Sequence, residues 1–176
     1  ELNPKGFLFE NVYGIIGDDL FGKEIVDQLK ELSVKVEGFI PLKYCDTSTY
    51  VKPLVISAET NRIDFGTKNT FDEFDFNSII KQLELDLPNL DLLIINQQFA
   101  QPLLTASRIG MLDKLLENFP NCKIIADLRN FGTMFRNGIL KVNVKELANL
   151  LFLDDLNEND TENCILAAKQ LSFQVC

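Results

Sequence analysis

The fold is decided by residues 121–151, NCKIIADLRNFGTMFRNGILKVNVKELANLL. An apolar run over residues 122–126 predicts a buried strand that ends at Asp127. A polar loop and a second short strand, residues 138–142, come next, and a helix is predicted to begin near Asn143. Strands that alternate with helices are typical of an α/β protein with a parallel sheet.

Polar side chains gather where these predicted elements meet. Asp127 follows the first strand, and Lys141 lies near the end of the second. Asn143 and Glu146 are three residues apart and therefore share one face of the helix. In an open α/β sheet, ligands bind where the carboxyl ends of strands meet the amino ends of helices. An amide and a carboxylate there suit Mg²⁺ held through water, and Lys141 is a point charge suited to a phosphate.

The same helix start also fits a purely structural role. Asn143 is a good N-cap, and a Glu three positions later completes a capping box, although Ser or Thr is the more usual first residue. A cap and a metal site do not exclude each other. Both interpretations therefore stay open for Asn143 and Glu146.

The composition excludes several classes of protein. The 176 residues are 46% hydrophobic and 24% charged, which is enough for one domain with a real core, and the net charge is −9. Nucleic-acid binding needs a basic face that releases counterions, so this charge argues against a general nucleic-acid binder. No apolar run approaches the roughly 18 residues of a membrane span, and no signal-peptide pattern opens the chain. We expect a cytoplasmic protein without a membrane partner.

The cysteine spacing and the absence of histidine limit the metal sites and catalytic mechanisms that we expect. Four cysteines stand at positions 45, 122, 164 and 176 without a CxxC pair, and the chain has no histidine. Structural zinc is therefore not expected, and reduced thiols are the simplest interpretation. The absence of histidine excludes every mechanism that uses an imidazole base.

A strand, a turn and a helix are predicted near the start of the chain. Residues 12–16 read as a short buried strand, residues 17–19 as the turn and residues 20–32 as the helix. The GIIGDDLFG run fits neither the GxGxxG nor the GxxxxGK(S/T) spacing of phosphate loops. Tight turning of the chain therefore explains Gly14 and Gly17 better than a phosphate site does.

The sequence pattern changes over residues 34–66, where β-branched and aromatic runs are separated by turn residues. Their alternation of polar and apolar side chains predicts a small antiparallel sheet, the β lid, with one buried and one wet face. Four side chains would line the wet face and bind hydroxyl groups: Thr47, Thr49, Arg62 and Asp64. A solvated surface with an ordinary Arg–Asp pair is the alternative. The exposed lid edge also favours a homodimer, because open strand edges seek partners.

Strands and helices alternate from residue 70 onward. A helix over residues 71–87 leads to an apolar strand, residues 90–95, and then to a helix over residues 103–119. Gln97 and Gln98 follow the strand, where amides either bind sugar hydroxyls or serve as plain loop residues. The pattern predicts a parallel sheet with helices on both faces.

Read together, these stretches resemble the ribokinase-like (PfkB) family of carbohydrate kinases, nearest to its heptose-phosphate kinases. The segments that carry the resemblance are GIIGDDLFGKEIVDQLKELSV, TSTYVKPLV with NRIDFG, INQQFAQPLLT, ADLRN, and KVNVKEL, which is similar to the family's K-P-N-x-x-E segment. The resemblance covers about residues 12–175. It implies a single α/β domain, residues 1–176, with a mostly parallel central sheet flanked by helices and a small antiparallel β lid at about residues 34–66.

The resemblance also implies an activity, the transfer of the ATP γ-phosphate to a hydroxyl of a sugar or sugar phosphate with Mg²⁺. Asn143 and Glu146 would position the metal. The nucleotide phosphates would meet Lys141, Asn143, Asp127 and Arg129. The acceptor would meet Thr47, Thr49, Arg62, Asp64, Gln97 and Gln98, and a closing lid would exclude water.

The chain departs from the family pattern in several places. Val142 replaces the usual Pro, and nothing before Val12 resembles the glycine pair that grips the sugar. The T-x-G-x-x-G strand and the G-A-G-D segment, whose Asp is the general base, are also missing. We therefore expect an incomplete domain that is inactive alone. A non-catalytic sugar- or nucleotide-binding regulatory domain is the alternative, and a dinucleotide oxidoreductase is disfavoured because GxGxxG is absent.

Overall fold

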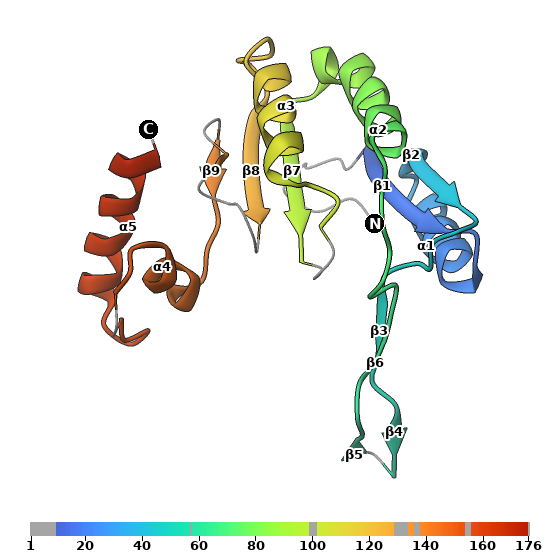
Figure 1. Cartoon of the computed structure of the whole chain (residues 1–176), viewed down its shortest axis with the longest axis horizontal. Coiled ribbons are helices and arrows are strands. Elements are labelled where there is room, and N and C mark those ends of the chain that lie inside the picture. Colours follow the sequence, from blue (N-terminus) through green and yellow to red (C-terminus); the bar gives the residue numbers. More distant parts are fainter. Residues whose placement is uncertain are drawn as a thin grey trace. The chain divides into compact units, whose positions relative to one another are not determined.

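The computed structural model describes residues 10–56, 58–98, 102–128, 134–135, 138–153 and 156–175, with side chains up to residue 172 (Figure 1). The chain divides into two compact units. The first comprises Glu1–Asp86 with Phe99–Gln101, and the second comprises Leu87–Gln98 with Pro102–Cys176.

The first unit is built on a pair of parallel strands. β1 (Asn11–Gly17) is followed by α1 (Leu20–Glu31), which crosses back so that β2 (Lys35–Leu42) pairs parallel with β1. α2 (Glu73–Asp86) packs against both strands. The prediction that residues 34–42 belong to the antiparallel lid is therefore wrong. The helical crossover α1 returns these residues to the amino end of β1, and this connection makes the pairing parallel.

The β lid is a narrow two-stranded ribbon. β3 (Thr49–Val51) pairs antiparallel with β6 (Ile63–Phe65), and further out β4 (Leu54–Val55) pairs antiparallel with β5 (Ala58–Glu59). Figure 1 shows the ribbon extending away from the parallel strands of its unit. The predicted antiparallel lid is thus confirmed over residues 49–65.

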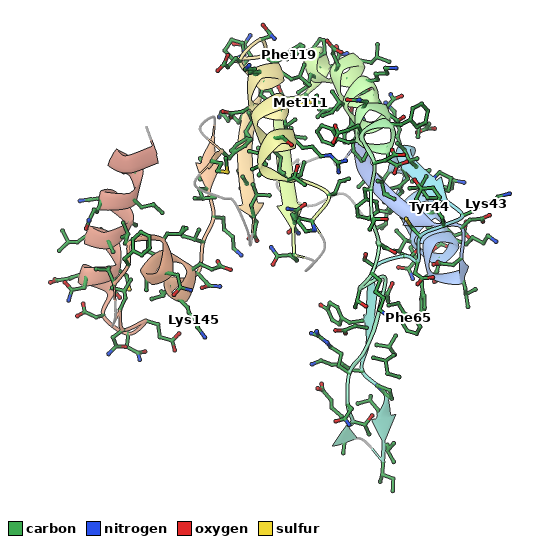
Figure 2. All side chains as sticks on the ribbon, viewed as in Figure 1. Lys43, Tyr44, Phe65, Met111, Phe119 and Lys145 are labelled. Atoms are coloured by element: carbon green, nitrogen blue, oxygen red, sulfur yellow. The ribbon has the colours of Figure 1, made fainter. Side chains whose placement is uncertain are left out.

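Aromatic packing anchors the lid at its base. The ring of Phe65 lies 5.2 Å from the ring of Phe21 on α1, and Figure 2 shows Phe65 at the base of the ribbon. Towards the tip the apolar side chains are uncovered, and Ile56 is 97% exposed. The lid is therefore held at one end only within its unit.

The second unit contains a three-stranded parallel sheet. After the 3₁₀ turn η1 (Leu87–Asn89), β7 (Leu92–Gln97), β8 (Lys123–Leu128) and β9 (Ile139–Leu140) pair in the order β7-β8-β9. α3 (Ala106–Leu116) connects β7 to β8. Ile109 and Ala126 are fully buried between helix and sheet elements of this unit. The parallel sheet predicted from the strand–helix alternation is confirmed.

Two helices follow β9 and pack on each other. α4 (Val144–Leu150) and α5 (Thr161–Val175) share a cluster of buried side chains formed by Leu147, Leu151, Ala167 and Leu171. Leu140 of β9 and Val142 pack against this cluster. Within the described ranges, none of the helices combines the length and apolar character needed to cross a bilayer.

Candidate functional site

The candidate site lies at the carboxyl edge of the β7-β8-β9 sheet. Its centre is an ion pair in which Lys141 Nζ donates to Asp127 Oδ2 at 2.7 Å. Asp127 is the penultimate residue of β8, and the backbone N–H of Lys141 donates to the Ala126 carbonyl at 2.8 Å, just after β9. The strand pairing itself thus brings these two predicted site residues together across 14 positions of sequence.

The ion pair leaves Lys141 charged and accessible. Its side chain is 61% exposed, whereas that of Asp127 is 23% exposed. The hydrogen bond to Asp127 raises the pKa of Lys141 above its ordinary value, and the charges of Asp127 and Glu146 raise it further. A lysine held in this way remains a cation at neutral pH and can meet an anionic group.

Asn143 and Glu146 form the predicted capping box. Asn143 Oδ1 accepts from the Glu146 N–H at 2.8 Å, and Glu146 Oε2 accepts from the Asn143 N–H at 2.9 Å. The structural interpretation of this pair is therefore confirmed. These two hydrogen bonds do not use Glu146 Oε1. The charge of the Glu146 carboxylate also contributes to the raised pKa of Lys141.

The fit of Mg²⁺ to this edge depends on the donors that remain. In the part of the chain that the structure describes, no group of three or more His, Cys, Asp or Glu side chains could enclose a metal ion. The capping box uses Glu146 Oε2 and the ion pair uses Asp127 Oδ2. Glu146 Oε1 and Asp127 Oδ1 are therefore the carboxylate oxygens that could act as metal ligands. Mg²⁺ keeps several waters and is bound through one or two carboxylates together with substrate phosphates. The donors therefore fit a water-mediated metal that a nucleotide brings, and they do not fit a metal held by protein alone.

Gln97, the last residue of β7, and Gln98, which follows it, have different roles. Gln97 is only 6% exposed, and its amide donates to the Leu104 carbonyl at 3.0 Å and accepts from the Leu104 N–H at 2.7 Å. Gln97 thus closes the loop into α3 and does not face the edge. Gln98 Nε2 instead contacts Asn96 Oδ1 at 3.0 Å and the Asp127 carbonyl at 3.3 Å.

Asn96 is a site residue that sequence reasoning missed. It is the register partner of Asp127, and paired residues of a sheet point to the same face. Asn96 is exposed, so its amide lies beside the Asp127–Lys141 pair and in contact with Gln98. The strand period of two could have revealed it, because Asn96 and Gln98 must share a face that excludes Gln97.

Arg129, the remaining residue assigned to the nucleotide, lies outside the described residues. Its role stays a prediction.

The lid does not present one polar face as predicted. Thr49 pairs with Phe65 and Tyr50 pairs with Asp64, so Thr49 and Asp64 point to opposite faces of the ribbon. Arg62 donates to Asp64 at 2.7 Å and lies 5.2 Å from the Tyr50 ring centre. Arg62, Asp64 and Tyr50 therefore form one polar face, and Thr49 shares the other face with apolar side chains.

Thr47 lies in neither lid strand and is 3% exposed. Its hydroxyl accepts from the Gly17 N–H at 2.9 Å and donates to Asp19 Oδ1 at 2.8 Å. Its backbone N–H donates to Asp19 Oδ2 at 2.7 Å. The hydroxyl predicted to bind an acceptor is thus used inside the protein, where it ties the start of the lid to the turn after β1.

Two cavities of the described chain are lined by none of the candidate site residues. One of about 150 Å³ lies between β1, β2 and α2, where Asn11 and Lys35 begin their strands. The other, of about 470 Å³, lies at the start of β8 and β9 and is lined by Leu116, Ile124 and Ile139 among others. Ligands of α/β sheets bind at the opposite, carboxyl ends of the strands. We therefore place the site by its polar groups and its position in the fold.

Solved structures of sugar kinases share this fold. The ribokinase from Giardia lamblia superposes with a TM-score of 0.68 at 13% identity, over 93% of this chain and 50% of its own. The Arabidopsis thaliana ribokinase complexed with ribose and ATP gives 0.63 at 15% identity, over 93% and 52%. The fold is ribokinase-like. The phosphofructokinase-2 from Escherichia coli in complex with fructose-6-phosphate agrees, with a TM-score of 0.60 at 18% identity over 92% and 52%.

The ribokinase-like fold is present here in part. The chain spans about half the length of each of these structures. No protein-family model matches the chain, and no curated protein matches it either. The fold is thus recognised from its three-dimensional arrangement at identities of 13–18%.

Proposed function

We propose that the whole protein is a carbohydrate kinase that transfers the γ-phosphate of ATP to a hydroxyl of a sugar or sugar phosphate. The observation that carries this proposal is the exposed Lys141 cation held by Asp127 at the carboxyl edge of a parallel sheet in a ribokinase-like fold. Ligands of open α/β sheets collect at this edge. The similar structures include one ribokinase complexed with ribose and ATP and one phosphofructokinase complexed with fructose-6-phosphate.

In this proposal Lys141 binds a phosphate of the nucleotide. Its ammonium group is exposed and is oriented by one carboxylate oxygen of Asp127. The remaining donors of the ammonium are available to phosphate oxygens. Arg129, two residues after Asp127, is proposed as a second phosphate contact.

Glu146 and Asn143 are proposed to position the metal. The capping box fixes both side chains at the start of α4, which leaves Glu146 Oε1 free to orient metal-bound water. Mg²⁺–ATP, when bound, supplies the phosphoryl group and neutralises the charge that develops during transfer. No residue of this chain is assigned as the general base.

The lid and the end of β7 are proposed to bind the acceptor. In the first unit, Arg62 and Asp64 on one face of the ribbon offer donors and acceptors for hydroxyl groups. In the second unit, Gln98 and Asn96 at the sheet edge offer the same kinds of groups. A ribbon anchored only at its base can close over a site and exclude water, which otherwise competes for the phosphoryl group. Gln97, Thr47 and Thr49 are not part of this proposal, because two are engaged internally and the third points to the other lid face.

The experiment is an assay of ADP release by the full gene product with Mg²⁺–ATP over a panel of sugars and sugar phosphates. Lys141→Met should raise the KM for ATP, and Glu146→Gln should lower kcat and raise the Mg²⁺ concentration needed for half-maximal rate. Lys145→Met is the matched control, because Lys145 is an exposed lysine of α4 outside the ion pair (Figure 2). Equal kinetics for all three variants and the parent would refute the assignment.

A regulatory domain that binds without turnover is the second candidate, because the given sequence has no counterpart of the G-A-G-D segment. It predicts that a sugar phosphate or ATP raises the melting temperature of the full gene product while no ADP is released. Turnover with any member of the panel decides for the kinase. The kinase proposal includes a cytoplasmic location, because the proposed phosphoryl donor is ATP.

A further inference from the structure

The cavity of about 150 Å³ in the first unit has a polar lining. Its walls come from the start of β1, the start of β2 and the last turns of α2, and none of its residues is assigned to the candidate site. At about 30 Å³ of liquid volume for each water, it has room for roughly five water molecules or a small ligand. We call it the Asn11 cavity, and its polar side chains are those of Asn11, Tyr13, Lys35, Glu37, Gln82 and Asp86.

A chain of hydrogen bonds fixes the orientation of the Asn11 amide. The Tyr13 hydroxyl donates to Asp86 Oδ2 at 2.7 Å, and Gln82 Nε2 donates to the same oxygen at 3.3 Å. Because the single hydroxyl proton of Tyr13 is used on Asp86, the Tyr13 oxygen accepts from Asn11 Nδ2, at 3.1 Å. The amide therefore cannot offer Oδ1 to Tyr13.

Asn11 Oδ1 is a buried acceptor without a donor. Its surface is closed to solvent, and no side chain or backbone group of the described chain reaches it with a hydrogen bond. A buried carbonyl oxygen in this state costs free energy, and native proteins rarely leave one unpaired. Empty cavities in proteins are apolar, whereas polar cavities hold water or a ligand. The Asn11 cavity therefore needs an occupant that donates a hydrogen bond.

The charges around the cavity favour a donor that is also a cation. Asp86 is the last residue of α2, where the helix carries partial negative charge, and the last turn of α2 holds no basic residue. The hydrogen bonds from Tyr13 and Gln82 use Asp86 Oδ2, so Asp86 Oδ1 remains an acceptor. Glu37 adds a second carboxylate against the one ammonium of Lys35, which leaves the lining with a charge of −1.

We propose that the Asn11 cavity binds a primary ammonium group, which donates one N–H to Asn11 Oδ1 and another to Asp86 Oδ1. An ammonium has N–H donors and no acceptor, so it matches a lining whose unused groups are acceptors. Water would satisfy Asn11 Oδ1 as well, but it gains nothing from the net negative charge. The ligand is a small free amine or the lysine side chain of another protein, since both carry this group on an alkyl stem. The inference does not depend on the proposed kinase activity.

The test is the melting temperature of the full gene product in ethylammonium chloride. Tetramethylammonium chloride at equal concentration is the control, because it has the same charge and no N–H. A ligand of so few atoms should bind with a Kd on the order of 1–10 mM. At about 50 mM, ethylammonium should therefore raise the melting temperature by roughly 2–5 °C more than the control does.

Two carboxylates of α2 provide matched variants. Asp86→Asn keeps the shape and an oxygen acceptor but removes the charge, and it should raise the Kd for ethylammonium at least ~10-fold. Glu84→Gln removes an exposed carboxylate of the same helix that does not line the cavity, and it should leave the Kd unchanged. Equal effects of the two substitutions would overturn the proposal, because the ammonium would then bind elsewhere on the acidic surface.

A blocked lysine, Nα-acetyl-lysine amide, distinguishes the two sources of the ammonium. Binding at least as strong as that of ethylammonium assigns the cavity to a lysine of another protein, and binding of ethylammonium alone assigns it to a free amine. Either result supports the proposal. Equal melting temperatures in ethylammonium and tetramethylammonium would overturn it, because the cavity then holds water only.

The side-chain amide of Asn11 gives a readout that locates the ligand. In protein labelled with ¹⁵N-asparagine, the Nδ2–H₂ signals of Asn11 are assigned by their absence in Asn11→Ser. They should shift with ethylammonium and saturate at the concentrations that saturate the thermal effect, because the ligand contacts the same amide. Signals that stay in place while the melting temperature rises would contradict binding in this cavity.

Discussion

Asp19 accepts two hydrogen bonds from Thr47, one from its backbone N–H at 2.7 Å and one from its hydroxyl at 2.8 Å, although 28 residues separate the two. Asp19 also caps α1 by accepting from the Gly22 N–H at 2.8 Å. One carboxylate therefore fixes the turn after β1, the start of α1 and the entry into the lid. Asp19 therefore holds the lid entry to β1 and α1, together with the Phe21–Phe65 contact at the lid base.

Asp19→Ala should lower the free energy of unfolding of the 176-residue chain by about 2–4 kcal/mol, because it removes a helix cap and hydrogen bonds to a charged group. The measurement is urea denaturation followed by circular dichroism. Asp18→Ala is the control, because Asp18 is exposed and its ion pair with Lys23 is 3.6 Å long. The control should change the free energy by less than ~0.5 kcal/mol. Equal losses in both variants would count against the anchoring role of Asp19.

The pKa of Asp19 predicts how this contribution depends on pH. Burial acts to raise the pKa, but hydrogen bonds from Thr47 and Gly22 outweigh it and hold the pKa of Asp19 below its ordinary value. A carboxyl group with a lowered pKa in the folded state stabilises the fold above its unfolded pKa, about 3.9, and loses this effect as pH falls through the folded pKa. The stability difference between the parent and Asp19→Asn should therefore be constant near neutrality and shrink below about pH 4. A difference that grows on acidification would contradict this assignment.

Two helical glycines should respond to alanine with opposite signs. A Cβ on Gly22 of α1 would collide with the Gly17 carbonyl oxygen and lie 2.8 Å from Thr47 Oγ1, whereas a Cβ on Gly110 of α3 would meet nothing within 4 Å. Gly110→Ala should therefore stabilise the chain by about 0.5–1 kcal/mol, as helix propensity predicts. Gly22→Ala should destabilise it by about 1–3 kcal/mol, because the backbone must shift. Thermal unfolding of both variants checks the signs, and a stabilising Gly22→Ala would show that the contact relaxes at no cost.

The outline of the site was predictable from sequence because it depends on local rules. Apolar runs placed the strands, and the position of Asp127 and Lys141 at strand carboxyl ends predicted that the two would meet. The N-x-x-E spacing predicted the cap formed by Asn143 and Glu146. Each of these inferences needs only strand or helix periodicity and the edge rule for α/β sheets.

The predictions that were wrong depend on pairing between segments that are far apart in the sequence. Thr47 became an internal anchor because Asp19, far away in sequence, lies next to it in the fold. Thr49 was predicted to share a polar face with Arg62 and Asp64. The register with β6 pairs it with Phe65 instead, and sequence alone does not fix this register. The residue types do not distinguish Gln97 from Asn96, because both are amides. The two side chains point to opposite faces of β7, and only the face with Gln97 is buried.

The open edges of the lid strands bear on the oligomeric state. Each lid strand pairs with one neighbour in the described chain, so each has a free edge, and the side chains of Leu54 and Ile56 at the tip are 66% and 97% exposed. Free edges flanked by apolar side chains are sites of strand pairing between chains. We propose that two copies pair through their lids and bury these side chains.

Sedimentation of the full gene product should then show a dimer at concentrations on the order of 10 µM, the range of a moderate protein interface. The double variant Leu54→Asp and Ile56→Asp should be monomeric with an unchanged melting temperature extrapolated to low concentration, because both side chains are exposed in the single chain. Leu85→Asp on α2, 71% exposed and outside the lid, is the control and should remain dimeric. A dimer that survives the lid variant but not the α2 variant would place the interface elsewhere, and a monomeric parent would exclude the pairing.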